Sequence, residues 1–137
     1  MKIYILNNQS SEEEGLIMRL YDEKYGTDSE GWQIKDYFGT MYESDLFEEA
    51  VINILNKKDF CINNSQCRFP NPNSYDDYDH FEGVEFEMGL FSDDSEIRVS
   101  EEECLSFIKE AVFSYEKKHP NRKGFADKLL EETKLGT

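Results

Sequence analysis

The sequence predicts a single α+β domain in which helices pack on a small antiparallel sheet. Two observations carry this prediction: several segments repeat apolar residues at helical spacing, and two neighbouring segments alternate apolar with charged residues as strands do. The length of 137 residues is that of one domain, so we expect residues 1–137 to share one core. Ten Phe and eight Tyr supply the ring surface that a folded domain needs and an acidic tail lacks.

The first elements come from the amino-terminal third of the chain. A short apolar run over residues 2–6 predicts a strand, and Ser11 with Glu14 forms a capping box for a helix over about residues 12–24. The aromatic segment 32–38 is compatible with helix or strand. Ser44 is expected to begin a second helix, whose apolar stripe contains Leu46, Phe47, Ala50, Val51, Ile54 and Leu55.

The middle of the chain predicts strands. Residues 60–69 indicate one bulged strand or a small hairpin, followed by a loop at Pro70 and Pro72. In the next strand, Glu85 and Glu87 face away from the apolar residues Val84, Phe86, Met88 and Leu90. A turn at residues 92–95 and alternation at 96–99 complete an antiparallel hairpin whose polar face is mostly carboxylate.

Helices are expected again at the carboxyl end. Ser100 and Glu103 form a second capping box, and the helix that follows should bury Leu105, Ile108, Val112 and Tyr115. Pro120 is expected to start a last helix that packs back on the domain.

The charge of the chain is strongly negative and unevenly distributed. The formal net charge is −15, and residues 75–103 contain 12 acidic residues against one basic residue, Arg98. This charge disfavours nucleic acid and anionic membranes as partners, so a macromolecular partner should be basic. The sequence contains no run of about 18 apolar residues and no signal-peptide pattern, from which we expect a cytoplasmic protein without a membrane partner.

The candidate partner-binding residues lie in this acidic block. Carboxylates interleaved with rings provide charge for steering and apolar surface for anchoring. The alternative interpretation is a solvated acidic loop and strand face without a partner. The predicted contacts are Tyr75, Asp76, Asp77, Tyr78, Asp79, Phe81, Glu82, Glu85, Glu87, Asp93 and Asp94.

No pattern in the sequence indicates catalysis, a metal or a cofactor. The EF-hand spacing fails, because a loop starting at Asp77 places Glu82 where glycine is required and Met88 where glutamate is required. Neither His80 nor His119 lies in a recognisable catalytic motif. The three cysteines form no Cys-x-x-Cys pair, so we expect reduced, mostly buried thiols and a protein that is not an enzyme.

Several segments resemble the ribonuclease-toxin immunity proteins of bacterial contact-dependent growth inhibition, the CdiI type. They cover most of residues 34–120: Ile34–Phe38, Cys67–Pro70, Phe81–Phe86, Ile97–Glu103, Ile108–Ala111 and Tyr115–Pro120. The resemblance implies an inhibitor of one cognate toxin, the carboxy-terminal domain of a large secreted protein delivered by a neighbouring cell. Contact residues in such proteins vary with the toxin, so the resemblance assigns none of them here.

The charge and the resemblance together predict an immunity protein that occludes the RNA-binding or active-site cleft of a basic ribonuclease domain. We expect a monomer in a one-to-one complex. Two other functions remain open at this point: a small carboxylate- or metal-dependent hydrolase, and a general acidic adaptor that mimics nucleic acid.

Overall fold

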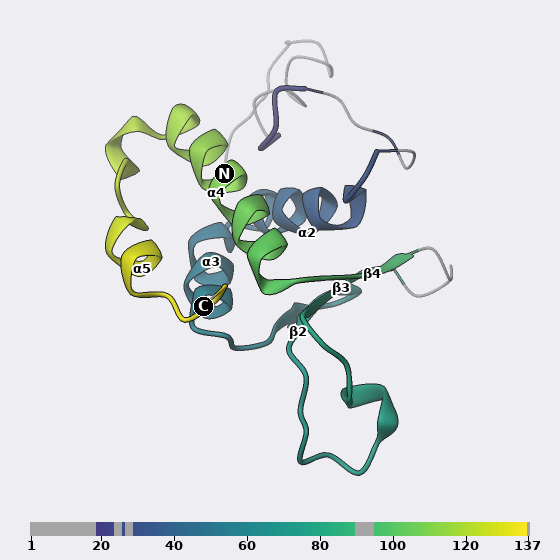
Figure 1. Cartoon of the computed structure of the whole chain (residues 1–137). Coiled ribbons are helices and arrows are strands. Elements are labelled where there is room, and N and C mark those ends of the chain that lie inside the picture. Colours follow the sequence, from purple (N-terminus) through teal and green to yellow (C-terminus); the bar gives the residue numbers. More distant parts are fainter. Residues whose placement is uncertain (1–18, 24–25, 27–28, 90–94, 137) are drawn as a thin grey trace.

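The computed structural model describes residues 19–23, 26, 29–89 and 95–136. These residues form an α+β arrangement in which helices cover one face of a four-stranded antiparallel sheet, so the predicted fold class is confirmed (Figure 1). Strand order follows the chain and every neighbouring pair is antiparallel. The strands are β1 (Phe60–Ile62), β2 (Ser65–Arg68), β3 (Val84–Met88) and β4 (Glu96–Val99).

The helices form one layer above the sheet. Helix α2 (Trp32–Glu43) contacts β2, β3 and β4, α3 (Phe47–Leu55) contacts α2 and β1, and α4 (Glu101–Lys118) packs on α2. Helix α5 (Asp127–Glu132) lies against α3. In Figure 1 the β2–β3 connection extends away from these helices, as a long loop at the bottom of the view.

The register of the strands divides the sheet into two faces. Cys67, Phe86 and Ile97 are neighbours across β2, β3 and β4 and belong to the helix-covered core. The ring of Phe86 lies 5.2 Å from that of Tyr37, whose hydroxyl donates a hydrogen bond of 2.6 Å to the Phe60 carbonyl oxygen. The alternate row, on the opposite face, contains charged residues because side chains alternate along each strand.

The aromatic segment that the sequence left unassigned is part of helix α2. Its buried residues Ile34, Tyr37, Phe38 and Met41 recur at spacings of three and four, which is the helical pattern. The start carries no side-chain cap, because the N-cap residue Gly31 has no side chain; its backbone is left-handed, with a φ of 74°. The absence of a polar capping residue explains why the start of this helix was hard to recognise.

Two expected helix starts are wrong. Ser44 is the C-cap of α2, and α3 begins at Phe47 without a side-chain cap. Pro120 begins only a short 3-10 turn, η3 (Pro120–Arg122), because Gly124 has a φ of +86° and interrupts the helix before α5.

The other predictions divide between confirmed and undescribed segments. The capping box of Ser100 and Glu103 is present at the start of α4, and residues 60–68 form a hairpin. Of the expected helix over about 12–24, the described part, residues 19–23, is not helical. The remainder of that helix, the strand at 2–6, Leu90 and most of the turn at 92–95 lie outside the described residues.

Candidate functional site

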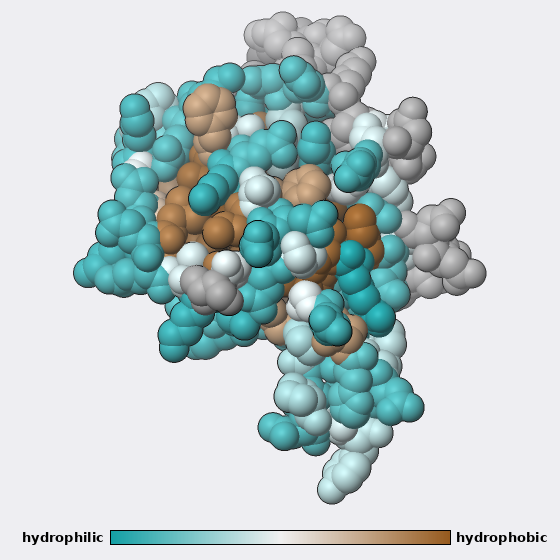
Figure 2. Space-filling view, in the orientation of Figure 1, coloured by the Kyte–Doolittle hydropathy of each residue, from teal (hydrophilic) through white to brown (hydrophobic). Residues whose placement is uncertain are grey.

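The described residues of the acidic block lie in three places on the fold. Its first part is the connection between β2 and β3, residues 69–83, which we call the docking loop. The second part lies on the strands β3 and β4, and the third, Glu101 to Glu103, forms the first turn of α4. In the view of Figure 2, hydrophilic surface covers the docking loop, while the hydrophobic side chains lie over the helices and the sheet.

The docking loop presents its rings and carboxylates at different depths. Tyr75 is 104% exposed and Tyr78 is 46% exposed, and both are among the large apolar or aromatic side chains that solvent reaches most easily. Asp76, Asp77 and Glu82 are also exposed. Five of the predicted contacts are therefore accessible on one projecting loop.

Hydrogen bonds within the loop fix its backbone. The amide of Asn71 donates to the carbonyl oxygen of Asp79 at 2.8 Å, which ties the two limbs of the loop together. The carboxylate of Asp76 accepts from the amide of Tyr78 at 3.0 Å and starts the 3-10 turn η1 (Asp77–Asp79). The hydroxyl of Ser74 donates to Asp79 at 2.7 Å, so this part of the chain has a defined conformation.

The carboxylate of Asp79 is engaged in hydrogen bonds within the protein. Its carboxylate accepts from Ser74 and, at 2.9 Å, from Nη1 of Arg68. The hydrogen bond from Ser74 and then that from Arg68 lower the pKa of Asp79, because both stabilise the charged carboxylate.

Glu85 is buried, and the expectation of an exposed carboxylate at this position is wrong. Its side chain is 1% exposed and accepts hydrogen bonds from Arg68 at 2.7 and 2.9 Å on one oxygen and from Arg98 at 2.9 Å on the other. Arg68, Glu85 and Arg98 are cross-strand neighbours on β2, β3 and β4. We call these three residues with Asp79 the Glu85 ion network. Two guanidinium groups compensate the charge that burial would otherwise make unfavourable.

Two rings of the docking loop cover this network. The guanidinium of Arg68 lies 4.2 Å from the centre of the Tyr78 ring, and that of Arg98 lies 4.8 Å from the centre of the Phe81 ring. Burial, followed by the charge of Glu85, raises the pKa of Tyr78. Phe81 and part of Tyr78 therefore cover the arginines beside Glu85, on the sheet face opposite the helices. This cover explains how Glu85 is removed from water.

A second acidic row on the same face has no cation in its strand register. Glu87 and Glu96 are directly opposite each other on β3 and β4, and Gln66 on β2 is the other neighbour of Glu87. Like charges in this position destabilise a sheet. Burial and then the charge of Glu85 raise the pKa of Glu96.

Three residues of this site, Arg68, Arg98 and Glu96, were not among the predicted contacts. The sequence does contain a signal for Arg98. It is the one basic residue within residues 75–103, and strand alternation places it on the same face as Glu85. Asp93 and Asp94, which were predicted contacts, lie outside the described residues.

The histidines and cysteines have structural surroundings. Nε2 of His80 is 2.8 Å from the Ser74 carbonyl oxygen, and Nε2 of His119 is 2.8 Å from the hydroxyl of Tyr42. Burial raises the pKa of the Cys104 thiol to about 12 and that of Cys67 well above its ordinary value, which disfavours the thiolate. The expectation of buried thiols is wrong for Cys61, which is exposed.

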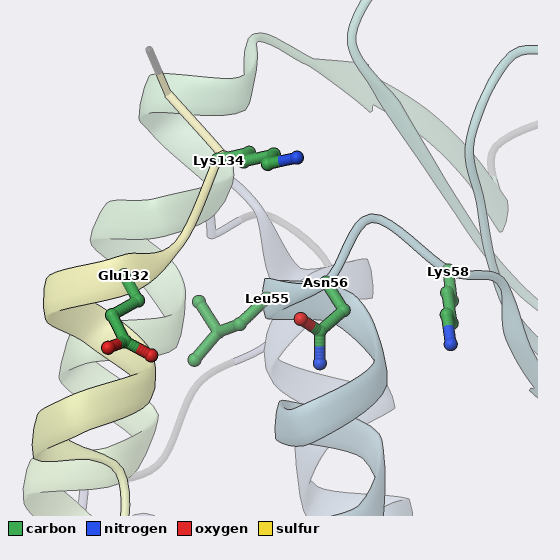
Figure 3. A pocket seen from close by; sticks show the side chains of 5 residues that line it. All are labelled: Leu55, Asn56, Lys58, Glu132 and Lys134. Atoms are coloured by element: carbon green, nitrogen blue, oxygen red, sulfur yellow. The ribbon is translucent and has the colours of Figure 1, made fainter.

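The rest of the described chain offers little for small-molecule chemistry. An open depression of about 300 Å³ lies between the ends of α3 and α5, and the ends of its polar side chains do not converge on one point (Figure 3). Its lining residues are Leu55, Asn56, Lys58, Glu132 and Lys134. Among the residues that the structure places, no group of three or more His, Cys, Asp or Glu side chains is arranged to hold a metal ion. No helix in the described ranges is long and apolar enough to cross a membrane.

Comparison with known proteins agrees with the resemblance noted in the sequence. No curated protein matches the chain. A family model described as CDI immunity protein matches residues 30–130, which include the sheet, α2 to α4 and the whole docking loop. CDI denotes contact-dependent growth inhibition, and membership implies that the protein neutralises a CDI toxin. The chain therefore belongs to the CDI immunity protein family.

Proposed function

We propose that this immunity protein neutralises its toxin without catalysis, by placing the docking loop and the adjoining acidic row on a cationic surface of the toxin domain. The observation that carries the proposal is that some residues of the acidic block are exposed while others make contacts inside the protein. Tyr75, Asp76 and Asp77 are exposed on a hydrogen-bonded loop, whereas Glu85 and Asp79 are used inside the protein to hold that loop.

The exposed residues suit a basic protein partner. Carboxylates at the loop attract cations over distances of about 10 Å, and exposed tyrosines contribute large contact area at low entropic cost. Because the backbone of the loop is already ordered by its own hydrogen bonds, binding loses less conformational entropy than it would from a disordered acidic segment. Charge and preorganisation together favour fast and tight association.

A ribonuclease is the toxin class that this surface fits best. An enzyme that holds RNA needs a cationic cleft, and a projecting loop of carboxylates and rings offers the chemistry of phosphates and bases to such a cleft. We infer that the loop occupies the RNA-binding or active-site cleft of a basic ribonuclease domain. The complex is one to one, with a monomeric immunity protein in the cytoplasm.

A charge-reversal experiment tests the docking surface. The full chain carrying Asp76→Lys and Asp77→Lys should associate with its co-expressed cognate toxin domain at least about tenfold more slowly at low salt, since steering is lost. The matched control is Glu110→Lys with Glu131→Lys, which reverses two exposed charges on α4 and α5. Equal association rates for the two variants would show that the docking loop is not the surface that binds the toxin.

Competition with RNA tests the occluded cleft. Purified toxin domain should degrade RNA, and a short RNA that binds its cleft should compete with the immunity protein in a titration. A stable ternary complex of toxin, immunity protein and RNA would contradict occlusion while leaving the docking loop as the binding surface. A toxin domain that leaves RNA intact would contradict the ribonuclease assignment.

A further inference from the structure

Arg68 joins the docking loop to the centre of the sheet. From β2 its guanidinium donates through Nε and Nη2 to the buried carboxylate of Glu85, at 2.9 and 2.7 Å. Through Nη1 it donates at 2.9 Å to Asp79, which lies in the loop. The planar fork of arginine provides these donors in directions that a lysine ammonium cannot reproduce.

The docking loop has no hydrophobic core of its own. Every residue from 70 to 83 is at least partly exposed, so burial of apolar surface contributes little to its conformation. Hydrogen bonds within the loop shape it locally, and Asp79 accepts two of them, from the Asn71 amide on its carbonyl oxygen and from the Ser74 hydroxyl on its carboxylate. Asp79 is thus the point where the local hydrogen bonds meet the contact from Arg68.

Arg68 also provides the platform for two rings of the loop. The ring centres of Tyr78 and Phe81 lie 4.2 and 5.5 Å from its guanidinium carbon. Arg98, the other cation of the Glu85 ion network, contacts Glu85 and Phe81 and is 42% exposed, against 14% for Arg68. The two arginines therefore share one charge partner, but only Arg68 has contacts with residues 78 and 79.

We propose that Arg68 is the positioning residue of the docking loop: it holds the loop in its toxin-binding conformation without touching the toxin. The inference rests on the proposed docking function of the loop. Glu85 is the fixed end of the connection, because its carboxylate is buried and held from both sides. Loss of Arg68 separates the loop from the sheet, and toxin binding then has to order the loop at an entropic cost.

The test compares two single variants of equal charge, Arg68→Met and Arg98→Met, in the full chain. Amide hydrogen exchange of the free proteins reports the order of the loop, and binding kinetics with the toxin domain report its use. In R68M the amides of Asn71 and Tyr78 should exchange about tenfold faster or more, and toxin affinity should fall by a similar factor. R98M should change both quantities by a clearly smaller factor than R68M, because Arg98 contacts Phe81 in the loop but neither Tyr78 nor Asp79.

A third variant covers the case in which R68M does not fold. Arg68→Met with Glu85→Met replaces the buried pair by apolar side chains, a kind of change that often preserves stability. The double change leaves the net charge unaltered, so a loss of affinity cannot come from weaker or stronger steering. It should retain the core while showing the same fast loop exchange and the same loss of affinity.

The outcomes separate this inference from the proposed function. If the variant with Asp76→Lys and Asp77→Lys loses binding while the folded Arg68 variants bind as R98M does, the positioning role is wrong and the docking surface stands. If loop exchange in the Arg68 variants equals that in R98M, the positioning role is also wrong. If no change in the loop affects binding, the docking surface itself is wrong, and the inference about Arg68 is overturned with it.

Discussion

Two clusters in the described part of the chain pair a carboxylate with arginine and aromatic rings, and they differ in depth. In the Glu85 ion network the carboxylate is 1% exposed and two arginines hold it in the middle of the sheet. In the second, which we call the Glu48 cluster, Glu48 is 26% exposed. It accepts hydrogen bonds of 2.7 and 2.8 Å from Arg122 and one of 2.6 Å from Tyr115.

The difference in depth indicates different roles. The Glu48 cluster joins α3, α4 and η3. Helices α3 and α4 already share the stacked rings of Phe47 and Tyr115, whose centres are 4.5 Å apart. The Glu85 ion network holds a loop that has no buried residue between 70 and 83. Ion pairs near the surface add little to a packed interface, whereas a buried charge is strongly destabilising once its partner is removed. The following changes test this contrast.

The largest expected effect is that of Arg68→Met. It leaves the buried Glu85 with Arg98 alone, and we expect the free energy of unfolding to fall by about 3 kcal/mol. Urea unfolding measures the change. The double variant R68M/E85M should recover most of the loss, because it removes both charges; a loss equal to the sum of the two single changes would show that the residues are not coupled.

A smaller effect is expected for Glu48→Ala. The lost hydrogen bond to Tyr115 is worth about 1 kcal/mol, and the exposed ion pair with Arg122 adds little to that. Toxin affinity should be unchanged, because the cluster lies away from the docking loop. If E48A lost as much toxin affinity as R68M does, the two clusters would not differ in function.

Acid should reduce the stability difference between the unchanged protein and E48A. Hydrogen bonding from Arg122 lowers the pKa of Glu48 against an opposing effect of burial, and the hydrogen bond from Tyr115 adds to the lowering. A carboxyl with a lowered folded pKa contributes stability that is complete above its unfolded pKa and is lost as the pH falls through the folded pKa. Urea unfolding near pH 7 and about pH 3 should show a smaller difference at the lower pH.

Glu96→Gln should stabilise the protein, whereas Glu48→Ala should destabilise it. Glu96→Gln removes one of two like charges that face each other across β3 and β4, so the free energy of unfolding near pH 7 should rise by about 0.5 kcal/mol. Because the pKa of Glu96 is raised in the folded state, the gain should vanish as the pH falls below the ordinary value of a glutamate. Toxin binding should weaken in this stabilised variant; a gain in both would place the acidic row outside the interface.

The smallest effect is expected for Asp22→Asn. Asp22 pairs with Lys117 and Lys118, and its side chain is 62% exposed, so solvent screens the interaction. The urea midpoint and the toxin affinity should both match those of the unchanged protein. A clear shift in the midpoint would mean that exposed pairs matter more in this chain than depth alone predicts.

The sequence predicts the parts of the fold that local patterns determine. The β3–β4 pairing follows from strict alternation, and α4 follows from the capping box at Ser100. The burial of Glu85 could not be predicted, because its partners lie 17 residues earlier and 13 residues later in the chain and meet it only across the sheet. Alternation assigns Glu85 to a face, but it does not show that the loop preceding β3 folds back over that face with Tyr78 and Phe81.

Gly83 gives the docking loop a second fixed end. It has a φ of +86°, and a Cβ at this position would collide with the Val99 carbonyl oxygen, so the chain re-enters the sheet where only glycine fits. Arg68 holds one end of the loop and Gly83 the other, and none of the residues from 70 to 83 is buried in the core. On the proposed docking function, substitutions at exposed residues such as Tyr75 and Asp77 change the surface offered to a toxin, while both fixed ends of the loop persist.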